Sequence, residues 1–340
     1  MLKQPFLNIS WVNIYMFITK RVIAGKQRFY LEETISQSSK RLKISVAIND
    51  NSELLTKFTE LKNKVILELA KETIKKYKLQ TLNFSEVIEL EKLKYNYKLF
   101  KYFFPESFIQ FDKDEFIRFA QGSASVEGNT LSLQQATQVI EKEVGVTGKS
   151  LFEIKEIQNL KLTKEFLQNK KEVSEKVIKK IHRLIMDGFS TKTPGEYRTS
   201  PVYILGSTHK PLIAEKVPAE MKKLMKFYQT NKQLHPVELA SYIHIYFESI
   251  HPFLDGNGRT GREIMNFILQ KNKYCRAIIN LDNRETYIAL LERLQESKEY
   301  YKFTKFVYSC LLERSKALEQ VIIDNQKEII NQLRKKLKIQ

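Results

Sequence analysis

The spacing of apolar residues constrains this chain most, and that spacing changes near residue 50. From there to the C-terminus, apolar residues recur at intervals of three and four, as in residues 52–79, and this period predicts amphipathic helices. Before that point, the β-prone runs at residues 14–23, 27–35 and 41–48 are separated by turn residues, which is typical of a meander of short strands. We therefore expect a mainly α fold preceded by a small β-rich N-terminal segment.

Two segments within the helical part depart from a simple pattern. Residues 193–212 contain prolines and glycines around the β-prone run VYIL, so we expect an extended hairpin or flap inside the helical domain. The tail after residue 310 has the pattern of one long helix, whose heptad repeat is broken by Asn325 and Gln332. Packing onto its own domain and formation of a homo-oligomer both stay open.

The formal charge of +18 favours an anionic partner. The chain has neither zinc-finger spacing nor an RNA-recognition aromatic signature, so no motif supports nucleic acid as that partner. The two cysteines, Cys275 and Cys310, provide neither a disulfide framework nor a four-ligand zinc site, which fits a reducing, cytoplasmic location. The apolar run at residues 6–18 is too short to span a bilayer, so we expect no membrane association, and both Met1 and Met16 remain candidate starts.

The stretch HPFLDGNGRTGR, which begins at His251, concentrates polar groups between two helical segments. Pro252 disfavours helical geometry in the preceding residue, so the first helix must end near His251. The glycines of the following loop allow positive φ, so that successive N–H groups can converge on an anion at the positive end of the next helix. The stretch therefore predicts a phosphate cradle formed by Gly256, Asn257 and Gly258.

The residues around this loop supply what phosphoryl-type transfer requires. Arg259 and Arg262 are three positions apart, so both guanidinium groups can face one polyphosphate. Asp255 offers a hard oxygen ligand for Mg²⁺. His251 has an ordinary pKa near neutrality, which suits it to take a proton from an attacking hydroxyl.

With these residues, the stretch resembles the signature of the Fic-domain family: His, any residue, Phe, any residue, Asp or Glu, Gly-Asn-Gly-Arg, any two residues, Arg. Every fixed position is met. The resemblance extends through GEYRTSPVYILGSTHKPL and back to SASVEGNTLSL, and it implies a mostly helical domain that transfers AMP from ATP to a hydroxyl side chain of a target protein. The chain would then divide into a β-rich segment (1–50), a helical linker region (51–115), the Fic domain (116–310) and a C-terminal helix (311–340).

The resemblance also implies roles for individual residues. His251 would be the base and Asp255 the Mg²⁺ ligand. Contacts to ATP would come from Gly256, Asn257, Gly258, Arg259, Arg262 and Tyr287. For Tyr287, which matches a position near the adenine, packing within a helix is an equal alternative.

SASVEGN, at residues 123–129, fits the inhibitory motif of the family, so the chain resembles the subclass whose inhibitory helix precedes the signature. The matching residues are Ser123, Glu127 and Gly128. By this resemblance Glu127 pairs with Arg262 and withholds it from the γ-phosphate, since a charge-assisted pair can compete with phosphate. The alternative is that Glu127 is a surface residue before a helix capped by Ser132 and Gln135.

Three functions follow as hypotheses. The leading one is a self-inhibited protein adenylyltransferase, in which main-chain pairing of a target loop with Tyr203, Ile204 and Leu205 presents a Tyr, Thr or Ser hydroxyl to His251. The alternative is a hydrolase that removes AMP from modified protein, with Glu127 orienting the water. A non-catalytic nucleotide-binding module is the third, and it would not need the base.

Overall fold

The computed structural model describes residues 15–24, 26–37, 40–49, 51–189, 193–203, 211–297 and 300–336. These residues form a mainly α protein with one small antiparallel sheet, as expected from the sequence. The chain divides into two compact units. The first consists of Val87–Pro105 with both ends of the chain, and the second consists of Lys76–Glu86 with Glu106–Ser315. In the described part of the chain, every helix is too short or too polar to cross a membrane.

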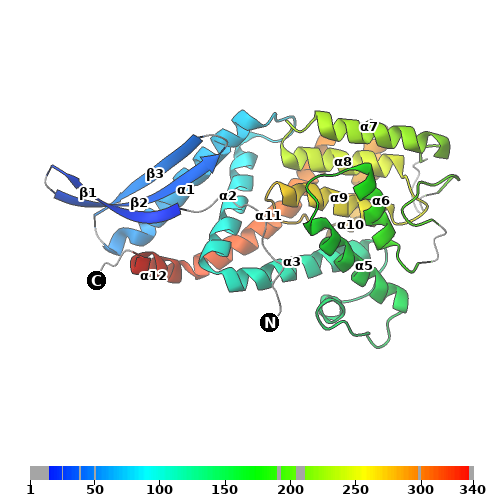
Figure 1. Ribbon diagram of the computed structural model, residues 1–340, viewed down its shortest axis with the longest axis horizontal. Coiled ribbons are helices and arrows are strands. Elements are labelled where there is room, and N and C mark those ends of the chain that lie inside the picture. Colours follow the sequence, from blue (N-terminus) through cyan, green and yellow to red (C-terminus); the bar gives the residue numbers. More distant parts are fainter. Residues whose placement is uncertain are drawn as a thin grey trace. The chain divides into compact units, whose positions relative to one another are not determined.

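The first unit contains the sheet, whose strands pair antiparallel in the order β1-β2-β3 and confirm the predicted meander (Figure 1). Its main elements are β1 (Tyr15–Ile23), β2 (Lys26–Gln37), β3 (Lys40–Ile48), η1 (Asn51–Glu53), α1 (Leu54–Lys76), α2 (Phe84–Phe103), the end of α11 (Tyr300–Asp324) and α12 (Gln326–Lys336). Alternate side chains of the strands point to opposite faces, and one face buries apolar residues such as Leu31 and Val46. Glu33 on that face accepts a hydrogen bond from Tyr95 of α2, so this face is turned toward the helices.

The C-terminal tail forms two helices rather than the single helix expected from its apolar pattern. α11 ends at Asp324 and α12 begins at Gln326. Between them, the side-chain amide of Asn325 donates a 2.8 Å hydrogen bond to the carbonyl of Val321. The backbone N–H of Asn325 donates to the same carbonyl at 3.2 Å, so side chain and backbone share one acceptor at the junction of the two helices.

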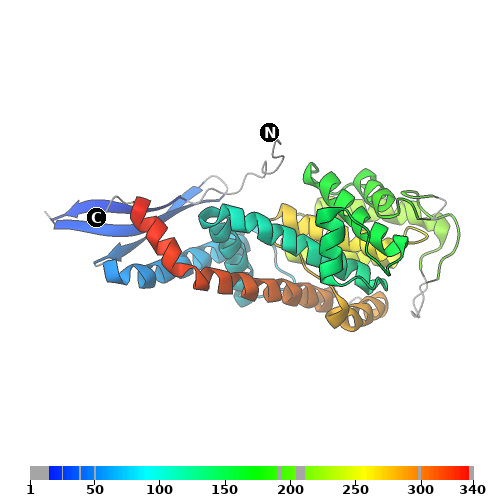
Figure 2. The same cartoon turned by 90° about the horizontal axis from the view of Figure 1, so that it is seen from below.

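The second unit is helical throughout its regular structure. Its elements are α3 (Pro105–Val126), α4 (Leu133–Thr137), η2 (Gln138–Lys142), α5 (Leu151–Gln168), α6 (Glu175–Ile185), η3 (Ala214–Lys216), α7 (Val217–Thr230), α8 (Pro236–Ile250), α9 (Asn257–Lys271), α10 (Leu281–Ser297) and most of α11. Figures 1 and 2 show α9, drawn in yellow, enclosed by other helices of this unit. Twelve of its fifteen residues are buried, including Arg259, Arg262 and Glu263. A helix buried on all sides is usually apolar, so these charged residues require partners from neighbouring helices.

Close packing against a loop requires a glycine in the middle of α3. A Cβ added at Gly122 would lie 2.6 Å from the carbonyl oxygen of Ile279, closer than carbon and oxygen can approach without a backbone shift. At Gly145, by contrast, an added Cβ would have no heavy atom within 4 Å.

We therefore expect Gly122→Ala to lower the free energy of unfolding by about 1–3 kcal/mol, the usual cost of overpacking. Gly145→Ala is the matched control and should leave stability unchanged or slightly increased. Melting temperatures of the two variants test this difference. Equal melting temperatures would show that the loop at Ile279 yields without cost.

Candidate active site

The signature begins where α8 ends. α8 stops at Ile250, and His251 adopts the left-handed conformation (φ 49°, ψ 61°) with its N–H donating to the carbonyl of Phe247 at 3.0 Å. The predicted helix end before Pro252 is confirmed. The chain changes direction at the proposed base. The left-handed φ and ψ values that His251 adopts there are uncommon for residues other than glycine.

The loop after His251 is held rigid by Asn257, the first residue of α9. Its side-chain oxygen accepts from the N–H of Phe253 and its amide donates to the Phe253 carbonyl, both at 2.9 Å. Gly256 has φ +73°, and a Cβ there would lie 2.6 Å from Sδ of Met186, so only glycine fits. The first N–H groups of α9 have no acceptor within their own helix, so the cradle expected at Gly258 and its neighbours lies at a helix N-terminus.

A histidine that sequence spacing did not single out fixes this loop from α6. Nδ1 of His182 accepts from the N–H of Gly195 at 2.8 Å, and Nε2 lies 2.8 Å from the carbonyl oxygen of Asp255. Since a carbonyl can only accept, the proton is on Nε2. The imidazole ring stacks on the ring of Phe253, with 3.7 Å between the two ring centroids. Burial lowers the pKa of His182 to about 4. A neutral imidazole therefore braces the loop at physiological pH.

Asp255 differs from its neighbours because its carboxylate is open to solvent. The side chain is 60% exposed, and Oδ1 lies 3.3 Å from Nη2 of Arg259. No group of three or more metal-binding side chains occurs among the described residues. A lone accessible carboxylate fits Mg²⁺ that is otherwise held by phosphate oxygens and water, which is the usual arrangement in phosphoryl-transfer sites.

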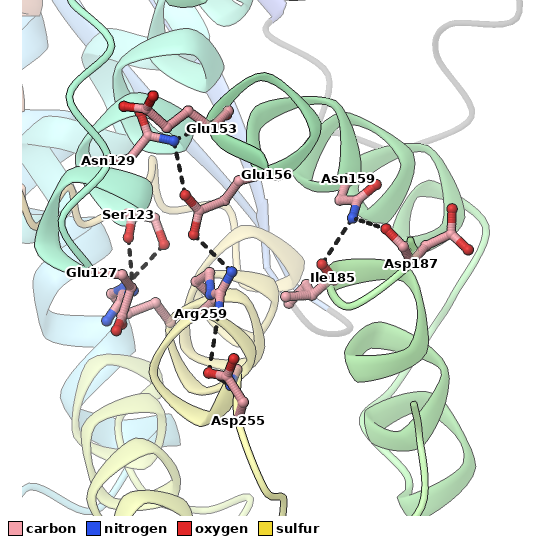
Figure 3. Close-up of polar contacts among 12 residues, drawn as sticks. Ser123, Glu127, Asn129, Glu153, Glu156, Asn159, Ile185, Asp187, Asp255 and Arg259 are labelled. Carbon is pink, nitrogen blue, oxygen red and sulfur yellow. Dashed lines mark hydrogen bonds and ion pairs between the residues drawn. The ribbon is translucent and has the colours of Figure 1, made fainter. Parts of the chain in front are cut away.

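Arg259 is buried and anchored by α5. Its Nη1 donates to Oε1 of Glu156 at 2.7 Å, while Oε2 of Glu156 accepts from Nδ2 of Asn129 at 2.8 Å (Figure 3). The same amide donates to the carbonyl of Glu153 at 3.0 Å. Burial raises the pKa of Glu156, and Arg259 opposes that shift. The sequence offered no signal for Glu156, which lies at no recognisable spacing from the signature, and Asn129 ends the SASVEGN stretch without a predicted role.

Arg262 is the most completely enclosed charge of the site, with 1% of its side chain exposed. Nη2 donates to Oε1 of Glu127 and to the carbonyl of Ser123, both at 2.8 Å, and Nε donates to Oγ of Ser123 at 3.0 Å. The expected contact between Glu127 and Arg262 is therefore present. Burial raises the pKa of Glu127, but Arg262 and Arg259 outweigh it and hold that pKa below its usual value.

Glu127 occupies the C-terminal end of α3. The N–H of Asn129 donates to the carbonyl of Ala124 at 3.1 Å and that of Gly128 to Ser125 at 3.0 Å, with φ +101° at Gly128. These bonds form a Schellman motif, which explains the glycine after Glu127. A carboxylate at this end of a helix is disfavoured by the helix dipole, so the arginine compensates for it.

The alternative placed Glu127 before a helix capped by Ser132 and Gln135. That capping box is present at the start of α4. It coexists with the contact to Arg262, so the two interpretations are not exclusive. The Glu127 side chain remains 37% exposed, which leaves one side of its carboxylate accessible.

Tyr287 lies in the buried core of the second unit. Its hydroxyl is 3.0 Å from Nε2 of His244 and 3.4 Å from Nη1 of Arg262, and its ring packs near Phe303. Tyr287 is thus packed within the helical core, as in the packing alternative given for it, and its position near an adenine stays a prediction. Its contact with the site runs through Arg262.

The base of the expected flap is attached to the signature by Arg198. The Nε group of this buried arginine donates to the carbonyl of His251 at 2.8 Å, and its Nη2 donates to the carbonyl of Leu212. Residues 193–203 and 211–213 contain bends and irregular segments without strands. Tyr203 is 95% exposed, whereas Ile204 and Leu205 lie outside the described residues, so the flap itself stays a prediction.

Glu248 is a buried carboxyl one helical turn before His251. Its Oε2 lies 3.9 Å from Nδ1 of His251. A Cβ on Gly261 would lie 2.3 Å from its Oε1. Burial raises the pKa of Glu248 to about 8, Arg262 opposes this shift, and Glu127 adds to it.

Part of the chain is similar to known proteins. Residues 172–269 match the Fic/DOC family. Protein adenylyltransferase Fic from Drosophila persimilis is 31% identical over 208 residues, covering 58% of this chain and 40% of the relative, and that from Aedes aegypti is 33% identical over 210 residues, covering 58% and 41%. The chain therefore spans less than half the length of these curated relatives.

Solved structures show the same fold. A Fic family protein from Desulfovibrio desulfuricans has a TM-score of 0.62 at 26% identity and covers 72% of this chain and 77% of that chain. A Fic domain-containing signalling protein from Bacteroides thetaiotaomicron has a TM-score of 0.62 at 24% identity, covering 68% and 95%. The fold of the matched part of the chain therefore recurs in other proteins.

The raised pKa of Glu248 predicts a pH-dependent cost to stability. The folded state keeps this carboxyl protonated up to a pH of about 8, whereas the unfolded chain ionises near 4.5. Folding stability from this group is therefore complete below 4.5 and is lost as pH rises toward 8. Glu248→Gln cannot ionise, so its free energy of unfolding relative to that of wild type should increase across that interval, by up to a few kcal/mol. Melting temperatures of the two proteins, measured from pH 4.5 to pH 8, test this increase. A difference that does not change with pH would contradict the assignment.

Proposed function

Because residues 172–269 carry the Fic/DOC domain, we propose that this protein transfers AMP from ATP to a hydroxyl group of a target protein. One observation carries the proposal: the turn between α8 and α9 brings an imidazole, an accessible carboxylate, a helix N-terminus and two buried arginines together. Phosphate binding would use Arg259, Arg262 and the first amides of α9. The relatives named protein adenylyltransferase support the same chemistry.

In the proposed reaction, a Tyr, Thr or Ser hydroxyl oxygen attacks the α-phosphorus of ATP. His251 takes the hydroxyl proton as the new oxygen–phosphorus bond forms, and pyrophosphate leaves. Asp255 would hold Mg²⁺, which neutralises phosphate charge when bound. Arg198 and His182 keep the loop in place from two sides, through the carbonyls of His251 and Asp255. Such rigid positioning of the reacting groups is itself a large contribution to rate.

We also propose that the resting protein inhibits itself. Glu127 and Ser123 together occupy three donor contacts of Arg262, so a γ-phosphate must displace the carboxylate to reach this guanidinium. A charge-assisted bond of this kind is strong enough to compete with phosphate. ATP would therefore bind in a poorly aligned position until Glu127 moves away.

A second candidate activity is removal of AMP from modified protein. A Cβ on Gly258 would lie 2.4 Å from Oε1 of Glu127, which places the carboxylate beside the anion-binding turn. In that position Glu127 could orient a water toward the same phosphorus. Transfer and removal would then share His251 and differ in the nucleophile. A non-catalytic role is disfavoured, because nucleotide binding alone needs no base.

The partner implied by either activity is a protein with an accessible hydroxyl. Cys275 and Cys310 are both free and buried, which is consistent with a reducing compartment such as the cytoplasm. The identity of the target is left to its capture by labelling.

The proposed base can be tested with α-labelled ATP and Mg²⁺ in cell lysate. His251→Ala should lose labelling of target proteins by at least about 100-fold, the usual contribution of a general base, while ATP affinity stays near the wild-type value. Chelation of Mg²⁺ should also abolish labelling. Wild-type labelling by His251→Ala would contradict the assigned role.

The proposed inhibition can be tested by removing the carboxylate. Glu127→Gly should bind ATP more tightly and label about 10- to 100-fold faster, the equivalent of losing one charged hydrogen bond, and adding Arg262→Ala should remove most of the gain. Glu143→Gly is the matched control, since Glu143 is exposed and has φ 55°, a conformation that glycine accepts. Loss of AMP removal by Glu127→Gly would support the second activity. Equal labelling by wild type and Glu127→Gly would refute the inhibitory role.

A further inference from the structure

The sheet of the first unit has a second face, which is strongly basic. The side chains of β2 at even positions point away from the face that carries Leu31 and Glu33, and the strand register adds their partners from β1 and β3. We call this set the basic face, and it consists of the exposed residues Arg21, Lys26, Arg28, Arg41 and Lys43. All five residues belong to the first unit, and the residues of the proposed active site belong to the second.

The acidic residues of the sheet are buried, whereas the basic residues of the basic face are exposed. Glu32 and Glu33 are the only acidic residues in the three strands, and both are 0% exposed. Glu33 lies on the face that meets α2, where it bonds Tyr95 and Lys98. All the exposed charges of the strands whose burial is described are therefore positive. A surface that only served solubility would normally mix both signs.

The buried carboxylate of Glu32 organises the basic face. It forms ion pairs with Arg21 of β1 and with Nζ of Lys43 of β3, the latter at 2.6 Å. The Arg21 guanidinium also lies 4.6 Å from the ring centroid of Tyr30. Two of the five cations are thus held across three strands before any partner binds, which lowers the entropy cost of binding an anion.

The register also contains an unfavourable pair. Arg21 lies directly opposite Arg28 in the β1–β2 ladder. Like charges at such positions destabilise a sheet. One Glu32 carboxylate offsets a single arginine, and the face keeps a net positive charge. The pair costs stability, and an anion bound on this face would offset that cost.

We propose that the basic face binds the phosphate backbone of duplex DNA. Two strand spacings of about 4.8 Å separate β1 from β3 by about 10 Å. This is close to the major-groove width of about 12 Å, so cations on the outer strands can reach both rows of phosphates. Contact of β-strands with the major or minor groove is an established mode of DNA recognition.

The test uses the full chain and a fluorescein-labelled duplex of arbitrary sequence, with anisotropy measured over a series of salt concentrations. Wild type should bind, and Arg28→Gln with Arg41→Gln should weaken binding by roughly 10- to 100-fold. The slope of log K against log salt should fall in magnitude by about 1.8, since each lost phosphate contact removes about 0.9. The matched control, Lys64→Gln with Lys75→Gln on α1, removes the same charge from exposed helix positions and should leave the slope unchanged.

Three outcomes would overturn the proposal. They are failure of the wild type to bind the duplex, equal loss of affinity by the two double variants, and retention of the wild-type slope by the sheet variant. Binding to phosphatidylserine-containing vesicles or to poly-glutamate without binding to the duplex would assign the face to a membrane or to an acidic protein instead. Melting curves of both variants establish that the exposed substitutions leave the fold intact.

Discussion

The fully buried guanidinium of Arg262 is the constraint on which the second unit depends. A buried charge without partners costs several kcal/mol, so its neighbours must supply acceptors. α3 provides the Ser123 hydroxyl and carbonyl together with the Glu127 carboxylate, and α10 provides the Tyr287 hydroxyl. These bonds tie α3 and α10 to the start of α9.

Arg259 repeats this arrangement on another side of α9, with Glu156 of α5 as its partner. Both arginines are therefore neutralised by carboxylates from neighbouring helices. Such a helix is costly compared with an apolar one of the same volume, because desolvation of each ion must be offset by good geometry. Departures from a simple apolar core of this kind are expected where function sets the requirements. The Asn129 amide links the two pairs, since it bonds Glu156 and lies two residues after Glu127.

Sequence reasoning succeeded where local chemistry decides the outcome. Pro252 ends α8 as expected, the strand meander forms, and the contact of Glu127 with Arg262 was expected from the family resemblance. The sequence did not indicate His182, Arg198 or Glu156, because these residues contact the site only through tertiary packing and have no characteristic spacing. At Asn325 the sequence predicted an interruption of the heptad repeat but one continuous helix, because the apolar spacing on both sides is helical, whereas the structure divides it into α11 and α12.

The Schellman ending of α3 determines what must move for the Glu127 carboxylate to leave Arg262. The residue lies between the last turn of the helix and Gly128, so its release requires movement at the end of α3 and not of the apolar residues buried along the helix. Fraying of chain segments of this kind takes nanoseconds to microseconds, far less than domain hinge motions. Ser123 can continue to hold the guanidinium while the carboxylate is away. Exchange between carboxylate and phosphate at Arg262 would then be a rapid local equilibrium, set by relative affinity, with no slow rearrangement of the fold.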